Sequence, residues 1–406
     1  MKLNGINNTT QYENNLECAL KLLYRMEECS RVALASELNL TQATITKLVN
    51  QLLLCGLVEE TTSIETSMGR KPKRIVLKKD RFFILTARIN RDYIKANLCD
   101  MHGGVIESRH ESISSNNPPR SVMMKLIDML RELKQLSTSP VLGIGVALPG
   151  PLDLRNSRIK MMSGFPGWDD IDIRNVLRES LNLPVFIEQD ANCGALAELW
   201  CGEHSANNLV YITCDRGVGA GVVIKGNVYH GRHGYAGEFG HMSINIGGPR
   251  CECGNRGCLE LYSSTWALEN EYNKALFARN LESPEESSLL TSQDILKRVR
   301  NGEPLACEIY ANTVRYLAFG TVSLVNMLNP DQVVFADKIT EGGPLFLDTV
   351  HEIFKLHLMP DLYKDLKVKT STIQKDPIML GASVLVYNCI LETALERILI
   401  PLADEI

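Results

Sequence analysis

Residues 238–260 hold the side chains of this chain with the most recognisable chemistry. Within eighteen residues they place one imidazole and three thiols, those of His241, Cys251, Cys253 and Cys258. One imidazole and three thiolates form the ligand set of a tetrahedral structural zinc ion. Free Cys is common in protein cores, but three Cys laced with Gly and preceded by a His argue against unconnected buried thiols. The stretch therefore predicts one structural Zn²⁺, with no open position for hydrolytic chemistry.

The same stretch carries a family signature. Its pattern E-x-G-H followed by C-x-C-G-x-x-G-C-x-E resembles that of the ROK family, which contains repressors, open reading frames and sugar kinases. The resemblance implies that sugar hydroxyls are contacted by Glu238, His241 and Glu260. Carboxylates and a fixed imidazole bind a polyol through charge-assisted hydrogen bonds, and the metal would hold His241 in place.

A second polar group follows a predicted strand at residues 184–188. The next residues, Q-D-A-N-C-G-A-L-A-E-L-W, read as a helix start, and a helix N-terminus stabilises Asp190 as an anion. In the ROK kinases the Asp at this position is the general base, and Asn192 lies beside it. The resemblance implies a sugar contact for both residues; the alternative is that Asp190 is only an N-cap.

The three glycine-rich loops that bind the nucleotide in ROK kinases are altered here. The first, normally D-x-G-G-T-K, reads R-I-N-R-D-Y at 88–93, and the second, normally G-T-G-x-G-G-G, reads D-R-G-V-G-A-G at 215–221. The third normally has consecutive glycines and reads A-D-K at 336–338. Asp215 places a negative charge where phosphate would sit. Because phosphoryl transfer depends on positioned phosphates, the sequence predicts a protein that is not an enzyme.

One departure concerns the sugar itself. Where many ROK kinases have P-N-x-x-G-W with a sugar-contacting Asn, this chain has Gly164. The effector is therefore left open between a sugar and a sugar phosphate.

The first eighty residues read as a DNA-binding head that follows a polar arm at 1–14. Helices are expected at 16–26, 31–38 and 42–54, the last two capped by Ser30 and Thr41. Small polar residues early in a third helix fit a recognition helix in a major groove, and the basic run at 70–74 fits a wing entering a minor groove. A protein-docking module and a solvated charge run are the alternatives. The predicted DNA contacts are Gln42, Thr44, Thr46, Lys47, Arg70, Lys71, Lys73 and Arg74.

Charge and cysteine usage support this division. Residues 1–80 carry eleven Lys/Arg against nine Asp/Glu, whereas the remainder carries thirty-two against thirty-nine, which suggests nucleic acid at one end only. No signal peptide or membrane-spanning apolar run is present, so no membrane insertion is expected. Twelve Cys, most of them scattered, suit a reducing cytoplasm.

From residue 81 the pattern becomes alternating strands and helices. Strands are expected at 82–89, 93–100 and 104–111, a helix at 121–136 and a buried strand at 141–147. This order resembles an α/β actin-like fold, the ribonuclease H-like, two-lobed fold of sugar kinases, preceded by an all-α winged helix-turn-helix domain. The expected domains are a DNA-binding domain at 1–80, a first lobe at 81–190 joined by the C-terminal helix (about 380–406), and a second lobe at 191–380 with the zinc loop and oligomerisation surface.

These features favour a sugar-responsive transcriptional repressor of carbohydrate genes, whose partners are operator DNA, a sugar or sugar phosphate, and further copies of itself in a homodimer or homotetramer. Two alternatives stay open. One is a sugar kinase with a DNA-binding head, which Asp190 supports and the altered loops oppose. The other is a repressor controlled by docking of a phosphotransferase-system protein.

Overall fold

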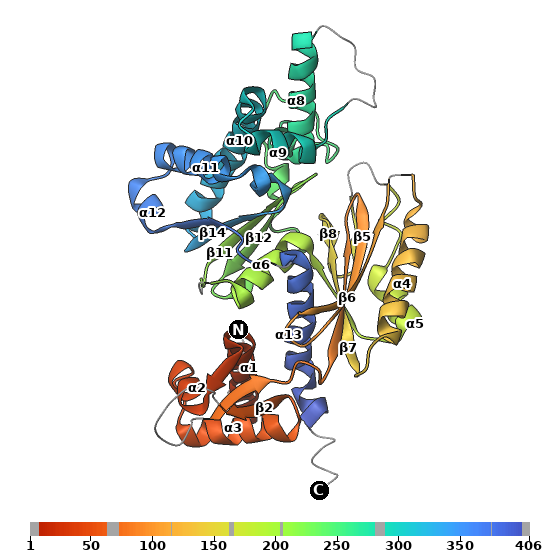
Figure 1. Cartoon of the computed structure of the whole chain (residues 1–406), viewed down its shortest axis with the longest axis vertical. Helices are drawn as coiled ribbons and strands as arrows, with labels where there is room; N and C mark the ends of the chain where they lie inside the picture. Colours follow the sequence, from red (N-terminus) through yellow and green to blue (C-terminus); the bar gives the residue numbers. More distant parts are fainter. Residues whose placement is uncertain are drawn as a thin grey trace.

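The protein has a winged head below a two-lobed body (Figure 1). The computed structural model describes residues 8–62, 73–114, 116–161, 166–203, 206–280, 289–374 and 376–399. The body has two α/β lobes, each built on a five-stranded sheet, as predicted for an actin-like fold. Among the described residues, no helix is both long and apolar enough to cross a membrane.

The head contains three helices and a small sheet. Its elements are α1 (Asn8–Met26), β1 (Glu28–Ser30), α2 (Arg31–Glu37), α3 (Gln42–Leu54), β2 (Val58–Thr62) and β3 (Lys73–Leu77), with strand order β1-β3-β2. The predicted caps are confirmed, because Ser30 accepts from the amide of Ala33 and Thr41 from that of Thr44. Gly56, at φ +64°, ends α3 in the left-handed conformation that favours glycine.

The first helix is longer than the sequence suggested. It begins at Asn8, so the stretch expected to be a polar arm is largely helical. The reason is that Tyr12 extends the apolar stripe of Leu16, Leu20 and Leu23 by one turn and packs against the same core. Its hydroxyl also donates to Gln51 of α3 at 2.8 Å.

The first lobe is built on a five-stranded sheet of order β10-β7-β4-β5-β6. The predicted meander is confirmed as an antiparallel run, and β7 and β10 continue the sheet in parallel with β4. Helices α4 and α5 pack against this sheet, and a small hairpin, β8 with β9, follows β7. The bounds are β4 (Phe83–Ile89), β5 (Tyr93–Cys99), β6 (Val105–Ser112), α4 (Pro119–Gln135), β7 (Val141–Leu148), β8 (Leu152–Asp153), β9 (Arg158–Ile159), α5 (Ile173–Leu181) and β10 (Val185–Gln189).

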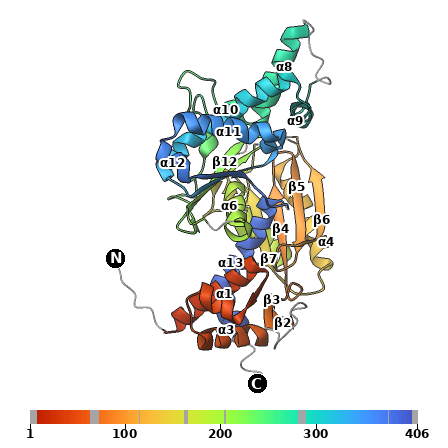
Figure 2. The same cartoon turned by 60° about the vertical axis from the view of Figure 1, so that its left-hand side comes forward.

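The second lobe repeats this plan with strand order β13-β12-β11-β14-β15. Helix α6 covers one face of its sheet, and the other face packs on the large helical layer (Figure 2). The bounds are α6 (Asp190–Cys201), β11 (Leu209–Cys214), β12 (Val218–Ile224), β13 (Asn227–Val228), η1 (Phe239–His241), α7 (Glu260–Ser263), α8 (Thr265–Asn280), α9 (Ser292–Arg300), α10 (Pro304–Leu328), β14 (Gln332–Ala336), η3 (Lys338–Gly342), α11 (Pro344–His357), α12 (Pro360–Asp365) and β15 (Lys367–Thr370).

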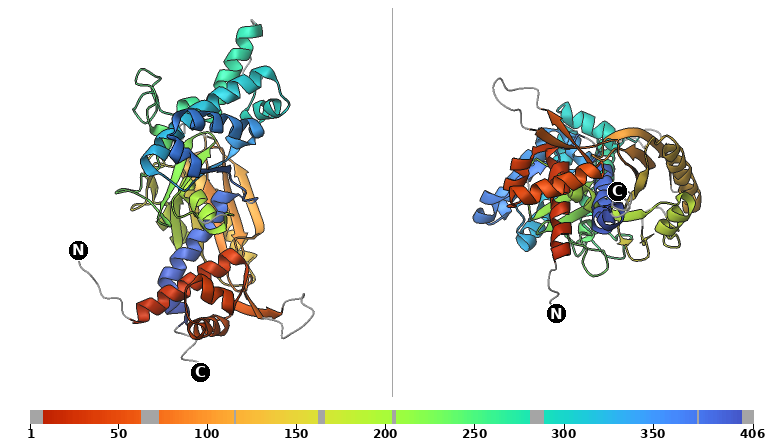
Figure 3. Two further views of the ribbon diagram at one scale, coloured as in Figure 1. Left: turned by 90° about the vertical axis from the view of Figure 1, so that its left-hand side faces the viewer. Right: turned by 90° about the horizontal axis from the view of Figure 1, so that it is seen from below.

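The last helix, α13 (Pro377–Leu399), returns to the first lobe and runs past its sheet toward the head (Figure 3). Backbones come very close here. A Cβ on Gly381 would lie 1.7 Å from the carbonyl oxygen of Cys193 in α6, and one on Gly145 of β7 would lie 2.0 Å from that of Ala382. Helix α13 is therefore clamped between the first sheet and α6, at the junction of the two lobes.

The head packs directly against this junction through aromatic side chains. Tyr24 of α1 packs edge-on against Trp200 of α6, with ring centroids 5.3 Å apart, and lies 5.2 Å from the ring of Tyr387 in α13. Trp200 and Tyr387 meet edge-on at 5.8 Å. These three rings, the aromatic socket, are buried in one hydrophobic cluster with the core of the head. Head, α6 and α13 thus share a core.

Candidate functional site

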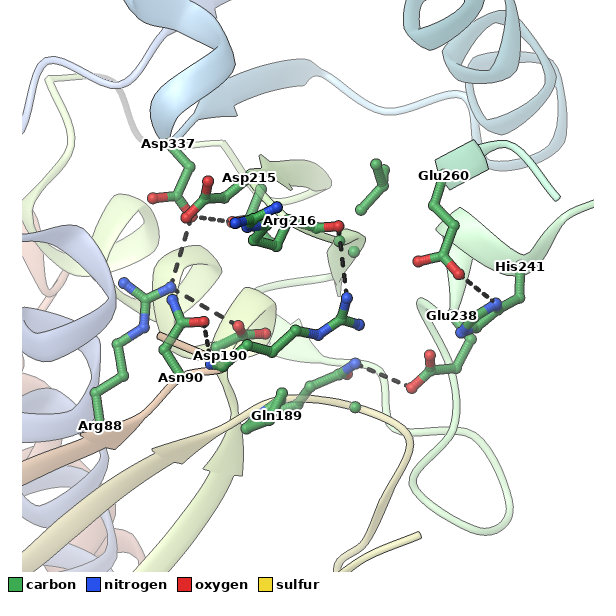
Figure 4. A pocket seen from close by; sticks show the side chains of 17 residues that line it. Arg88, Asn90, Gln189, Asp190, Asp215, Arg216, Glu238, His241, Glu260 and Asp337 are labelled. Carbon is green, nitrogen blue, oxygen red and sulfur yellow. Dashed lines mark hydrogen bonds and ion pairs between the residues drawn. The ribbon is translucent and has the colours of Figure 1, made fainter. Parts of the chain in front are cut away.

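A polar pocket of about 70 Å³ lies between the two lobes (Figure 4). The first lobe contributes the ends of β4, β7 and β10, and the second contributes the β11–β12 turn, the η1 region and the residue after β14. The lining residues are Arg88, Asn90, Arg91, Pro149, Gly150, Gln189, Asp190, Thr213, Asp215, Arg216, Gly217, Val218, Gly219, Glu238, His241, Glu260 and Asp337.

Four of the five predicted sugar contacts come together here: Asp190, Glu238, His241 and Glu260. Asp190 opens α6, and its carboxylate accepts from the amide of Ala191 at 2.7 Å. Burial raises the pKa of Asp190, and the nearby Arg88 guanidinium partly offsets this. The carboxylates and imidazole therefore face one space from both lobes, an arrangement that suits a hydroxyl-rich ligand.

Asn192 does not line the pocket. It is fully buried, and its amide donates to Glu188 at 2.9 Å. Glu188 also contacts the His230 ring at 2.6 Å. Asn192 thus stabilises the start of α6 on the side away from the pocket, next to Asp190. It does not face a ligand in this arrangement.

Gln189 joins the lobes across the sugar side of the pocket. Its side-chain amide, at the end of β10, donates to Glu238 of the second lobe at 3.0 Å. Gln189 was not predicted as a site residue, because its only distinguishing feature in the sequence is its position next to Asp190. The pKa of Glu238 is raised to about 7, first by burial and then by the negative charges of Asp190 and Glu260.

This shifted pKa predicts a pH-dependent cost to folding. The folded protein holds the proton of Glu238 to higher pH than the unfolded chain, whose ordinary value is 4.5. Stability is therefore fully present below about pH 4.5 and falls as the pH rises to about 7, by at most about 3 kcal/mol. Glu238→Gln removes the ionisable group, so the variant should gain stability relative to wild type at pH 8 but not at pH 4.5.

Thermal unfolding at both pH values measures this effect. Glu308→Gln on α10 is a matched control, because Glu308 is exposed and does not line the pocket. An equal difference between Glu238→Gln and wild type at the two pH values would show that the carboxyl is not held protonated.

The predicted metal ligands form a compact cluster beside the pocket. The ligand atoms of His241, Cys251, Cys253 and Cys258 all lie within 4.8 Å of one another. Nδ1 of His241 is 3.7 Å from Sγ of Cys251, and the thiols of Cys253 and Cys258 are 3.6 Å apart. A donor set of three thiols and one imidazole at such spacing can hold a metal ion.

The loop around this cluster is built for sharp turns. Gly254 and Gly257 have φ of +92° and +65°, and a Cβ on Gly257 would lie 1.8 Å from the carbonyl oxygen of Asn245. Only glycine fits that approach. The chain therefore folds back so that the thiols converge, and the loop then delivers Glu260 at the start of α7.

Glu260 connects the cluster to the pocket. One of its oxygens, Oε1, lies 3.3 Å from Nδ1 of His241 and 3.3 Å from Sγ of Cys251. The residue also lines the pocket with His241 (Figure 4). A change in the loop therefore displaces two of the candidate sugar-contacting side chains, those of His241 and Glu260.

Two of the three segments that the sequence predicts to be altered nucleotide loops contact each other. Arg88, from the first loop, is buried and lies 3.6 Å from Asp337 of the third loop and 3.8 Å from Asp190 (Figure 4). Thr213 donates to the same carboxylate of Asp337. In the second loop, Asp215 accepts from Thr265 at 3.2 Å. The chain's own charged side chains thus fill the side of the pocket next to these loops.

Two further contacts cross the gap between the lobes. Arg91 of the first lobe donates to the carbonyl of Arg216 at 3.5 Å. Arg216 in turn reaches Asp92 at 3.5 Å and Glu269 at 3.1 Å. In the sequence Arg91 showed only as a replaced glycine and Arg216 only as the residue after Asp215, so their contacts across the gap were not predicted.

The predicted DNA contacts are divided between exposed and paired side chains. Gln42, Thr46 and Lys47 are exposed on α3, and Thr44 is half-buried with its hydroxyl 2.9 Å from that of Thr41. On the wing, Lys73 pairs with Glu60 at 2.5 Å, and Arg74 pairs with Glu28. Arg70 and Lys71 lie outside the described residues.

Comparison with known proteins agrees with this architecture. The chain is 31% identical to the xylose repressor of Bacillus spizizenii over 93% of its own length and 96% of that protein. It is 30% identical to a glucokinase of Halalkalibacterium halodurans over 62% of its length and 77% of the enzyme. A crystal structure of a ROK family transcriptional regulator, a homologue of the E. coli MLC protein, superposes with a TM-score of 0.76 and 26% identity, covering 95% of this chain and 99% of that one. The ROK family model matches residues 85–388, and the chain belongs to the ROK family.

Proposed function

We propose that this protein is a sugar-responsive transcriptional repressor of carbohydrate genes. The observation that carries the proposal is the combination in one chain of a winged helix-turn-helix head with a ROK body. The pocket of that body keeps four predicted sugar contacts but fills its nucleotide side with its own ion pairs. The similarity to a xylose repressor along nearly the whole chain supports this reading.

In this proposal each function belongs to a separate segment of the chain. Residues 1–80 bind operator DNA, residues 81–190 together with the C-terminal helix from about 380 form the first lobe, and residues 191–380 form the second. The sugar binds between the lobes to Asp190, Glu238, His241 and Glu260, with Asn192 behind them. Helix α6 links the two functions, because Asp190 opens it at the pocket and Trp200 near its other end packs on the head. A sugar that favours one arrangement of α6 therefore shifts the head.

The metal in this proposal is a structural zinc ion held by His241, Cys251, Cys253 and Cys258. Nδ1 of His241 faces the cluster, which leaves Nε2 for the pocket. The ion supplies a rigid support for the loop rather than a reacting centre. With it bound, His241 and Glu260 keep their positions as the lobes move.

A second copy of the chain is the proposed occupant of the surface beside the zinc loop. A hollow of about 1010 Å³ lies between α8, α10 and that loop. Its walls expose large apolar side chains, with Trp266 47%, Tyr316 45% and Phe319 50% accessible. Exposed apolar areas of this kind mark interaction sites, and a surface that matches itself closes as a symmetric dimer. This supports the expected homodimer or homotetramer.

Absence of kinase activity is the first prediction of this function. Incubation with ATP and a panel of sugars should give no ADP above background, because the carboxylates of Asp215 and Asp337 face the space that phosphates need. The glucokinase relative makes this test necessary. ADP formation that is lost in Asp190→Asn would show a kinase with a DNA-binding head, whereas sugar-dependent release of operator DNA without ADP is the expected result.

Operator binding should depend on the exposed charge of α3. Lys47 lies 5.3 Å above the ring of Tyr12, which orients its ammonium group on the recognition surface. Lys47→Ala should weaken operator binding about tenfold and reduce the salt dependence by roughly one phosphate contact. Titration at several salt concentrations measures both effects. Lys297→Ala on α9 removes an equivalent exposed charge far from the head and should change neither; equal effects of the two variants would exclude α3 as the DNA contact.

A further inference from the structure

The pocket carries more negative than positive side chains. Its carboxylates are those of Asp190, Asp215, Glu238, Glu260 and Asp337, against three guanidinium groups. The charge of a ligand must be matched inside a poorly hydrated pocket. Which effectors can bind therefore depends on whether those three arginines are already paired with carboxylates of the protein.

Two of the arginines are already engaged. Arg88 is surrounded by Asp337, Asp190 and Asp376 at 3.6, 3.8 and 3.9 Å. Arg216 is held by Asp92 and Glu269, which lie outside the pocket lining. The buried Arg88 cannot turn to a ligand phosphate without leaving Asp337 and Asp190 unpaired, which is costly. Arg216 is partly exposed, and turning it toward a ligand gives up two ion pairs.

Arg91 is the remaining cation. In the described part of the chain it forms no ion pair, and it reaches from the first lobe toward Gly217. A Cβ built on Gly217 would lie 3.4 Å from Nη2 of Arg91 and 3.8 Å from Oε2 of Glu260. The guanidinium and an acidic group of the opposite lobe thus flank the same spot, and the positive charge of Arg91 also acts to lower the pKa of Asp190.

We infer that the effector is an uncharged sugar and that the pocket discriminates against sugar phosphates. A phosphate ester brings a charge of about −1.5 to −2 at neutral pH. It needs free guanidinium groups in a fork geometry. Here it meets the carboxylate of Glu260 and the partly ionised carboxyl of Glu238, with a single partly balanced arginine. Hydroxyls face no such conflict, because they donate to carboxylates and accept from Arg91. The inference rests on the proposed function and narrows its ligand class.

Paired ligands test the inference on the full-length, zinc-loaded protein. Calorimetric titration should compare glucose with glucose 6-phosphate, xylose with xylose 5-phosphate, and N-acetylglucosamine with its 6-phosphate. For whichever sugar binds, we expect the phosphate to bind at least about 100-fold more weakly. A phosphate that binds as tightly as its sugar, or more tightly, overturns the inference while leaving sugar sensing intact. If neither member of any pair binds, sugar sensing itself fails, and the inference fails with it.

Arg91 variants separate hydroxyl binding from anion binding. Arg91→Ala should weaken the uncharged sugar about tenfold through the loss of a charged donor, and Arg91→Lys should recover part of this. If Arg91 were an anion receptor, Arg91→Ala would weaken the phosphate more than the free sugar, and this result would contradict the inference. Unchanged thermal unfolding of both variants shows that the pocket remains folded.

Discussion

Cys258→Ser should reduce the zinc content from one ion per chain to nearly none and abolish the response to sugar. Cys258 is fully buried at the centre of the cluster, and its backbone pairs with Ser243 to close the loop. Structural zinc in small motifs contributes about 10–16 kcal/mol of apparent binding free energy. Its loss should therefore unfold the loop and displace Glu260 and His241, lowering sugar affinity at least about 100-fold.

Elemental analysis and calorimetric titration on the same preparation measure these two effects. Cys307→Ser is the matched control, because Cys307 is a partly buried thiol on α10 outside the cluster. Operator binding by the unliganded Cys258→Ser variant should persist, because the core of the head packs with residues of α6 and α13 and with none of the cluster (Figure 1). Retention of a full zinc complement in Cys258→Ser would refute the ligand set.

Trp200→Ala should destabilise the protein by about 3–5 kcal/mol, the usual cost of removing a large buried aromatic side chain. Trp200 is only 8% exposed and packs edge-on against Tyr24 of the head and Tyr387 of α13. The same change should also make operator affinity insensitive to sugar, because it cuts the contact through which α6 reaches the head.

Denaturant unfolding and operator titration with and without sugar test the two parts separately. Trp200→Phe keeps an aromatic ring in the socket and should retain most of the stability and the response. If Trp200→Ala is unstable yet still releases operator normally on sugar binding, the signal does not pass through this contact.

Local features of the fold were predictable from the sequence, because they depend on neighbouring residues. Ser30 and Thr41 cap their helices through amides three residues away, and the metal cluster draws its ligands from one short loop. The start of α1 was missed because the Asn- and Thr-rich segment has low helix propensity, and only its packing on α3 through Tyr12 makes it helical.

The contacts that define the pocket were harder to foresee, since they join distant segments. Arg91 and Arg216 are 125 positions apart, and the sequence shows only that the loop pattern is altered at each of them. Asn192 illustrates the opposite case, because its type and position suggested a ligand contact while the turn of α6 directs it to Glu188. Side-chain direction follows from the start of a helix, which spacing alone does not reveal.

Because of the aromatic socket, the head cannot be transferred to another protein without losing part of its core. A fragment cut after residue 80 would carry Leu16, Leu20 and Tyr24 with part of their covering surface gone, because that surface belongs to α6 and α13. Such a fragment should aggregate or melt early, and the same head grafted onto a ROK kinase body would need an acceptor for Tyr24. Operator preference is therefore easier to alter through point changes on the exposed face of α3 than through exchange of the whole head, since such changes leave the socket intact.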